Sequence, residues 1–330
     1  MTVIEGIEVP HYTLNNEIKY AILNNEPIEE FLHVIMVVSN PCNFARRIIL
    51  AKEFIQRMEF EKHVKLYIVE MAYNNEPYYL TDEFNSMHLR LRTKHLLWHK
   101  ENMINLGIQK LLPADWKAAA WIDADVEFES PEWALHALKV LNGSRDIVQL
   151  FSHAVDMDPQ QHAMRIFQSF GFQYNKGMKY TNGGLNYFHP GYAWAITRRA
   201  YEKIGGLYQN GILGSGDFNM AMSLIGKAIS SVNRGECDSY KNDVLAYETR
   251  IKGLRIGYIP GVIRHYYHGT KANRFYNTRW KILIEHVYDP IKHITTDKDG
   301  IIIPTEDFPK TMLQEIRNYF YSRNEDDKVI

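Results

Sequence analysis

Cysteine and long apolar runs are both scarce in this sequence, and each scarcity excludes a class of protein. Only two of the 330 residues are cysteines, Cys42 and Cys237, too few for a disulfide framework or a zinc site built from cysteines. No stretch of about 18 apolar residues is present, which excludes a membrane-spanning helix. The opening residues have neither the basic start nor the apolar run of a secretory signal. We therefore expect a soluble, cytoplasmic protein of a reducing compartment, without a membrane span.

An excess of charge of one sign is also missing. Lys and Arg together number 38 and Asp and Glu 39, so the net charge is −1. Nothing in this balance provides a global positive field for nucleic acid or an anionic membrane. Hydrophobic residues make up 45% and charged residues 23%, which is typical of a folded globular protein and excludes a disordered chain.

Short apolar runs alternate with segments of helical spacing through the first half of the chain. We expect strands at 31–39, 64–69, 118–122 and 146–151, and helices at 44–58, 93–112 and 132–141. The second half should contain a glycine-rich loop at 212–217, a helix at 220–229 and an interrupted strand within 254–265. This order predicts an α/β fold with a mixed, mostly parallel sheet flanked by helices. We expect one domain over 31–280, an N-terminal extension over 1–30 and a helical C-terminal extension over 281–330.

Two carboxylates follow the third expected strand. In the segment WIDADVEF, Asp123 and Asp125 come directly after a buried apolar run, at the sheet edge where ligands bind in open α/β folds. Residues two apart in an extended segment point the same way, so both acids can face one site. Converging carboxylates suit Mg²⁺ or Mn²⁺, ions that often bridge acids to substrate phosphates. This Asp-x-Asp pattern therefore favours a metal site.

Two other interpretations of the carboxylate pair compete with a metal site. A bare Asp-x-Asp is often a solvated turn or a helix cap. The aspartyl nucleophile of phosphatases also uses Asp-x-Asp, but it follows the first strand and has Thr or Val at the place that Glu127 occupies here.

The order and spacing of these motifs resemble the metal-dependent nucleotide-sugar glycosyltransferases of the GT-A fold, over roughly residues 31–276. The most similar families are the β-1,4-galactosyltransferases and the polypeptide N-acetylgalactosaminyltransferases. The resemblance implies a Rossmann-like GT-A domain, in which Asp125 binds the metal and Asp123 contacts the donor.

The donor side of that family matches two further segments. Val38, Ser39 and Asn40 follow the first strand, where the family binds the nucleotide. The Asn-x-Gly ending at Gly107 matches a family motif whose nucleotide-binding arginine stands five residues earlier, at Lys100 here. Lysine keeps the positive charge but loses bidentate geometry, and a solvent-facing helix lysine is the equal alternative. The family's run of arginines is missing, so the sequence leaves open whether the base of the donor is the uracil of UDP or that of another nucleotide.

The acceptor side matches residues 182–217, which contain a Gly-Gly pair and then a Gly-x-Gly directly followed by an acid at Gly214–Asp217. The resemblance implies that the carboxylate of Asp217 is the catalytic base that deprotonates the acceptor hydroxyl. It also implies that Gly216 lets the backbone approach the sugar. Trp194 is a candidate to stack on the acceptor sugar, although a core position is the alternative. A glycine-rich loop with one Asp is also an ordinary turn. The family's second acid is replaced by Phe218.

Two histidines lie at the end of the strand expected within 254–265 and just after it. Ile263, Arg264 and His265 match the Ile-Arg-His that supplies a metal ligand in the galactosyltransferases, and His268 stands three residues later. Imidazole beside carboxylate favours Mn²⁺ over Mg²⁺. Lys271, just beyond, can contact a diphosphate.

The resemblance thus implies an Mn²⁺-dependent glycosyltransferase that moves a sugar from a nucleotide-sugar, UDP-sugar first among them, to a hydroxyl of a glycan or other acceptor, with inversion at the anomeric carbon. One alternative is a sugar nucleotidylyltransferase, but the segment SNPCNFARR after the first strand lacks the glycines that such an enzyme carries there. The other alternative is a sugar-binding module without catalysis, which would have no reason to keep Asp123, Asp125, Asp217 and His265.

Overall fold

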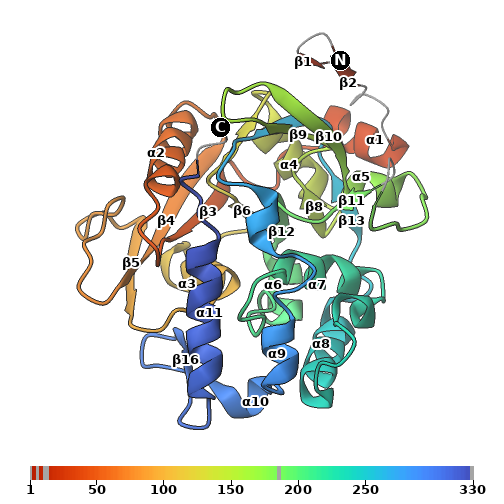
Figure 1. Cartoon of the computed structure of the whole chain (residues 1–330). Coiled ribbons are helices and arrows are strands. Elements are labelled where there is room, and N and C mark those ends of the chain that lie inside the picture. Colours follow the sequence, from red (N-terminus) through yellow and green to blue (C-terminus); the bar gives the residue numbers. More distant parts are fainter. Residues whose placement is uncertain (1, 5–6, 10–14, 184–186, 328–330) are drawn as a thin grey trace.

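A seven-stranded sheet forms the centre of the computed structural model, which describes residues 2–4, 7–9, 15–183 and 187–327 (Figure 1). The strands stand in the order β5-β4-β3-β6-β12-β8-β13. Of these described strands, β12 alone runs opposite to the other six, so the sheet is mixed and mostly parallel. Their bounds are β3 Leu32–Ser39, β4 Val64–Tyr73, β5 His88–Thr93, β6 Ala118–Ile122, β8 Ile147–Gln149, β12 Ala193–Thr197 and β13 Ile256–Tyr258.

Helices cover both faces of this sheet. Successive side chains of a strand point to opposite faces, so in β3 Ile35 enters one core and Val34 and Met36 enter the other. The Ile35 face packs against α3 Lys100–Leu111, α6 Arg198–Ile204, α7 Gly216–Leu224, α8 Asp238–Ile251 and α11 Lys310–Ser322. The opposite face packs against α1 Asn16–Asn24, α2 Ala45–Glu59 and α4 Trp133–Leu141. Burial on both faces explains why β3 is a continuous apolar run.

A second sheet, of five strands, carries His265 and Asp156 of the candidate site. Its order is β11-β10-β9-β14-β7, with bounds β7 Val126–Phe128, β9 His153–Met157, β10 Ala163–Ser169, β11 Phe188–His189 and β14 Val262–His265. The turn 123–125 leads the chain from β6 of the first sheet to β7 of the second. The Asp-x-Asp motif therefore lies at the junction of the two sheets.

The remaining elements are short. They are β1 Thr2–Ile4, β2 Ile7–Val9, α5 Phe170–Asn175, η1 Ala228–Ser231, η2 Lys271–Arg274, α9 Lys281–Glu285, α10 Pro290–His293, β15 Ile294–Thr296 and β16 Ile302–Pro304. Figure 1 shows α11 running along the molecule, and the last described residues, which follow α11, beside α2.

The structure confirms the α/β class and the mixed, mostly parallel sheet, and it corrects two element boundaries. The helix predicted over 93–112 begins at Lys100, because the segment before it ends strand β5 and then forms a connecting loop. The helix predicted over 220–229 begins at Gly216 and ends at Leu224. Gly216 and Asp217, predicted in a loop, therefore belong to the first turn of α7.

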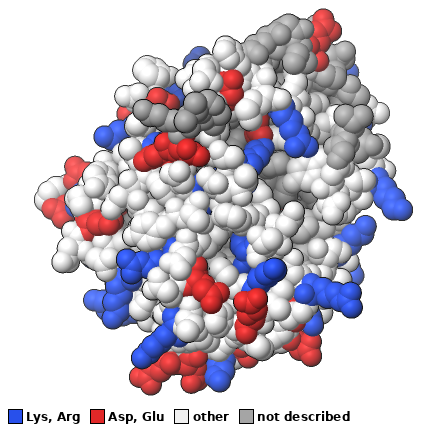
Figure 2. Space-filling model, in the orientation of Figure 1, with Lys and Arg blue, Asp and Glu red and all other residues white. Residues whose placement is uncertain are grey.

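The surface agrees with the balanced charge. On the face shown in Figure 2, Lys and Arg side chains alternate with Asp and Glu side chains and form no continuous basic area among the described residues there. Across the described ranges of the chain, we find no helix with the length and apolar character needed to cross a membrane.

Candidate active site

Asp123 and Asp125 lie in the turn between β6 and β7, where the parallel strands of the central sheet end. Main-chain hydrogen bonds fix this turn: the N–H of Asp123 donates to the carbonyl of Tyr192 (2.9 Å), and the N–H of Tyr266 donates to the carbonyl of Asp125 (2.8 Å). The two carboxylates have separate partners: Asp123 pairs with Lys100, and Asp125 lies beside two histidines.

Asp125 gathers with His265 and His268 into a cluster whose ligand atoms all lie within 4.8 Å of one another. Nε2 of His268 lies 2.9 Å from Oδ2 of Asp125 and 3.2 Å from Nε2 of His265. Oδ1 of Asp125 is buried without a hydrogen-bond partner among the described residues, and Nε2 of His265 is 3.8 Å from it. Neighbouring ligands around a small divalent ion, each at about 2.1 Å, stand about 3 Å apart. The spacing and the unsatisfied oxygen therefore fit a divalent metal ion.

The charge of Asp125 also suits a metal ligand. Burial by itself would raise the pKa of this carboxyl group, but His268, His265 and Arg274 hold it below its usual range. Asp125 is therefore ionised under ordinary conditions, as a hard oxygen ligand must be.

Strand pairing brings His265 to this cluster and adds a carboxylate that the sequence analysis missed. In the second sheet His265 pairs with Val126 on one side and with Asp156 on the other. Nδ1 of His265 lies 2.9 Å from Oδ1 of Asp156, a buried residue that also accepts the hydroxyl of Tyr192 (3.1 Å). A carboxylate on one imidazole nitrogen directs the other nitrogen toward a metal. The acid inside the apolar segment HAVDM was the available signal.

Lys271, predicted to contact the diphosphate of a donor, makes an ion pair with the same Asp156. Its ammonium group therefore lies beside the histidine cluster, and half of the side chain is exposed.

Lys100 forms an ion pair with Asp123 and so joins α3 to the Asp-x-Asp turn. Burial by itself would lower the pKa of Lys100, but Asp123, Asp217 and Glu101 together raise it. The structure thus brings together two residues that were predicted separately on the donor side. The alternative of a solvent-facing helix lysine is wrong, because Lys100 begins α3 pointing into this acidic cluster.

Asp217 lies in the first turn of α7, next to a second acid. Its Oδ1 accepts the N–H of Phe218 (2.8 Å), and its Oδ2 faces the α-carbon of Gly191, where an added methyl carbon would lie 2.6 Å away. Gly216 packs on the carboxylate of Glu101 so closely that an added methyl would overlap it. Gly216 is therefore required for the contact between α7 and α3.

Glu101 was not identified from the sequence. It is 7% exposed and accepts the indole N–H of Trp98 (2.9 Å). Burial raises its pKa to about 7; Lys100 opposes this shift and Asp217 adds to it. A buried carboxyl group with a raised pKa beside another acid is typical of acid–base sites. An acid directly after Lys100 and before the uncharged run 102–109 was the available sequence signal.

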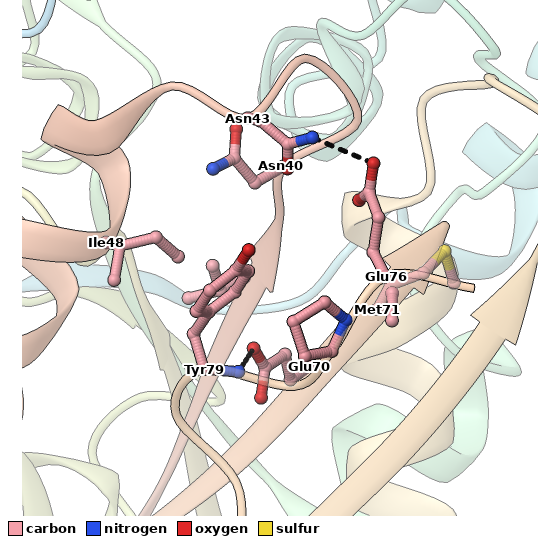
Figure 3. A pocket seen from close by; sticks show the side chains of 10 residues that line it. Asn40, Asn43, Ile48, Glu70, Met71, Glu76 and Tyr79 are labelled. Carbon is pink, nitrogen blue, oxygen red and sulfur yellow. Dashed lines mark hydrogen bonds between the residues drawn. The ribbon is translucent and has the colours of Figure 1, made fainter. Parts of the chain in front are cut away.

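The residues predicted to bind the nucleotide lie at the end of β3. Val38 and Asn40 line a small pocket between the ends of β3 and β4, together with Glu70 and Tyr79 (Figure 3). Glu70 is not available to a ligand, because it accepts hydrogen bonds from three consecutive main-chain N–H groups at 79–81. Ser39 lies beside this pocket, and its hydroxyl is 2.7 Å from that of Tyr73.

Trp194 does not belong to the site, which corrects its prediction as an acceptor-binding residue. It is 1% exposed in the middle of β12, and its indole N–H donates to the carbonyl of Pro190 (2.8 Å). Its ring packs near Phe170 in the hydrophobic core. A buried ring has no face for a sugar, so the alternative of a core position is confirmed. Residues 184–186, part of the glycine-rich segment of the same prediction, lie outside the described residues.

Comparisons with known proteins give structural likenesses without a sequence match. No protein-family model matches the chain, and no curated protein matches it. The chain is similar to the catalytic domain of Drosophila β1,4-galactosyltransferase 7 in complex with xylobiose, at 10% identity and a TM-score of 0.39, covering 89% of this chain and 99% of that one. It is also similar to a mannosyltransferase from Pyrobaculum calidifontis in complex with GDP-mannose and Mn²⁺, at 12% identity and a TM-score of 0.38, covering 84% and 69%. At these values neither likeness identifies the activity of this chain.

Proposed function

We propose that this chain is a metal-dependent glycosyltransferase of the GT-A type, which moves a sugar from a nucleoside-diphosphate sugar to an acceptor hydroxyl. The observation that supports it best is the convergence, at one edge of the sheet, of the cluster Asp125–His265–His268 with the ion pair Lys100–Asp123 and with Asp217. A set of metal ligands, a cation and a carboxylate are groups that can assist the displacement of a diphosphate by a hydroxyl.

In this proposal Asp125, His265 and His268 hold the divalent ion. Two imidazoles with one carboxylate favour Mn²⁺ over Mg²⁺, since imidazole is the softer ligand. When bound, the ion neutralises charge on the departing nucleoside diphosphate. The buried oxygen of Asp125 that lacks a partner in the described chain is the observation that fits this role.

The other residues act on the donor and the acceptor. Asp123, held by Lys100, contacts the donor, and we place its nucleotide along the end of β3 at Val38, Ser39 and Asn40. Asp217 takes the proton of the acceptor hydroxyl, for which it needs reach and an ionised carboxylate. Direct attack by that hydroxyl inverts the anomeric carbon. We propose a UDP-sugar as the first donor to test.

Hydrolysis of donors tests the proposal without knowledge of the acceptor. A panel of nucleotide-sugars is incubated with the protein in Mn²⁺ or in EDTA, and release of nucleoside diphosphate is measured. We expect slow, Mn²⁺-dependent release from one donor, absent in Asp125→Ala. A panel without any Mn²⁺-dependent release, combined with no nucleotide binding by calorimetry, would contradict the proposal.

A further inference from the structure

The last described residues of the chain, 323–327, lie across the candidate site, and we call them the C-terminal strap. Asp326 caps the first turn of α2, because its carboxylate accepts the N–H groups of Ala45 (2.8 Å) and Arg46 (2.9 Å). The N-terminal end of α2 has no side-chain cap of its own from Phe44. The strap thus connects the last described residues to the start of α2, the helix that follows β3 (Figure 1).

Glu325 is the buried centre of the strap. Its side chain is fully buried and pairs with Arg47 of α2 and with Arg323 of the strap itself, each through a contact of 2.7 Å to Oε1. The two guanidinium groups balance the charge of this buried carboxylate. An ionised carboxylate held between two guanidinium groups has a fixed orientation.

This fixed carboxylate faces His268. Oε2 of Glu325 lies 3.7 Å from Nδ1 of His268, whose other nitrogen lies 2.9 Å from Asp125. Nη2 of Arg274 is 2.7 Å from Nδ1 and 2.9 Å from Nε2 of the same ring. A nitrogen almost equally far from both ring nitrogens lies over the ring, so Arg274 does not occupy the in-plane direction of Nδ1.

The strap also packs on the backbone next to His268. Gly269 adopts φ +94, and a methyl added there would lie 2.9 Å from the α-carbon of Glu325. On the opposite side of the strap, the guanidinium of Arg323 lies over the ring of Trp98 at 5.4 Å, and Trp98 donates to Glu101. The strap therefore contacts the histidine loop directly and is linked to Glu101 of α3 through Trp98.

We propose that the C-terminal strap completes the metal site, with Glu325 as a positioning residue that holds His268 toward Asp125. The arrangement resembles that of Asp156 behind His265, at a longer distance: each imidazole has a buried carboxylate on its Nδ1 side, 2.9 Å away for Asp156 and 3.7 Å away for Glu325. The inference rests on the proposed metal site, and it assigns to the end of the chain a role in assembling that site. Binding of the ion and docking of the strap are then coupled, and coupling between two equilibria is reciprocal.

The first test measures Mn²⁺ affinity by electron paramagnetic resonance in the full chain, for the wild type, Glu325→Gln and the control Glu315→Gln. Glu315 lies on α11 and pairs with His286, away from the cluster. We expect Glu325→Gln to weaken Mn²⁺ binding roughly 10–100-fold, the usual effect of removing a partner behind a metal ligand, and Glu315→Gln to leave it unchanged. Equal affinity of wild type and Glu325→Gln overturns the inference alone. No Mn²⁺ binding by the wild type overturns the proposed metal site and the inference with it.

The second test needs no variant, so a folding defect of Glu325→Gln cannot obscure the result. Hydrogen exchange of the peptide covering 320–327 is followed in the wild type with and without saturating Mn²⁺. We expect Mn²⁺ to slow exchange there at least several-fold, while the exposed loop at 158–162 exchanges at an unchanged rate. Identical strap exchange in both conditions, with Mn²⁺ shown to be bound, overturns the coupling.

Discussion

Two acids two residues apart have different chemical environments in this molecule. Asp123 pairs with a lysine, whereas Asp125 faces two imidazoles. The difference comes from the neighbours that the fold supplies, since both residues leave the same strand. At the residue scale, the environments of the other two acids also come from the fold: Asp217 lies in the first turn of α7, and Glu101 is buried at the start of α3.

Replacing Asp217 with asparagine separates binding from chemistry. If Asp217 is the general base, Asp217→Asn keeps the shape of the side chain but cannot accept the proton. Transfer to an acceptor should then fall by roughly 10²–10⁴-fold, in kcat and in kcat/KM alike. Donor affinity, measured by calorimetry in Mn²⁺, should stay near that of the wild type. Transfer within a few fold of wild type, together with a lower melting temperature, would instead show that Asp217 only structures the start of α7.

Glu101 should make the stability of the protein depend on pH. Its pKa of about 7 in the folded state lies above the ordinary value of 4.5, so between these values the folded state binds more protons than the unfolded state. Stability from this group therefore falls as pH rises from about 4.5 to 7. Glu101→Gln removes the effect, so the free energy of unfolding of the variant relative to wild type should be higher at pH 8 than at pH 5, on the order of 1–3 kcal/mol. Denaturant titrations at the two pH values measure it, and an equal difference at both would show an ordinary pKa.

Helix α3 is the element that sets the distance between the sheet and the acidic cluster. Its first two residues, Lys100 and Glu101, reach the candidate site, and Gly107 lies directly against the sheet. A methyl added at Gly107 would lie 2.8 Å from a methyl of Val69 and 2.9 Å from one of Ile35. The absence of a side chain at Gly107 allows the helix to approach the strands, which positions its N-terminal end beside Asp123 and Asp217.

Gly107→Ala should therefore destabilise the protein, although alanine is the better helix former. Overpacking of a close contact costs about 1–3 kcal/mol, which outweighs the gain of about 1 kcal/mol in helix propensity. Chemical denaturation measures the net loss. The matched control is Gly183→Ala, because an added methyl there meets no atom within 4 Å in the described structure. Equal stability of both variants would contradict the close packing of α3 on the sheet at Gly107.

At the scale of the whole molecule, the candidate site joins distant parts of the chain. The turn after β6, the end of β14, the start of α3 and α7, and the C-terminal strap all meet there. His265 and Asp156 are 109 positions apart in the sequence, and Glu325 and Arg47 are 278 apart. A ligand that binds these segments together stabilises the folded state as a whole, since the unfolded chain cannot present them jointly.

Mn²⁺ should accordingly raise the thermal stability of the full chain. At a free concentration of 100 times its dissociation constant, the ion adds about 2.7 kcal/mol to the free energy of unfolding. We expect the melting temperature to rise with Mn²⁺, to rise less with the same concentration of Mg²⁺, and to return to its starting value after EDTA. Asp125→Ala should show no rise. A rise of equal size in Asp125→Ala would place the stabilising ion elsewhere.

The sequence by itself determined the α/β class, most strands of the central sheet and the place of the Asp-x-Asp motif. These features depend on local apolar periodicity and on what directly follows a buried strand, and both can be read within a few residues. It also predicted His265 and His268 as metal ligands, through the resemblance of Ile263–His265 to a family motif, and the structure places both beside Asp125.

The tertiary structure decided which side chains support those residues and which candidates are buried. Strand register places Asp156 beside His265, and the packing of α7 on α3 places Glu101 beside Gly216. The position of the C-terminal strap places Glu325 near His268. None of these placements is encoded in local periodicity. Trp194 was misassigned for the same reason, because an aromatic residue within YAWAI fits a core strand and a sugar platform equally well until its neighbours are known. Local patterns specify which residues are buried and in which element, whereas convergence in a site depends on pairings across the whole chain.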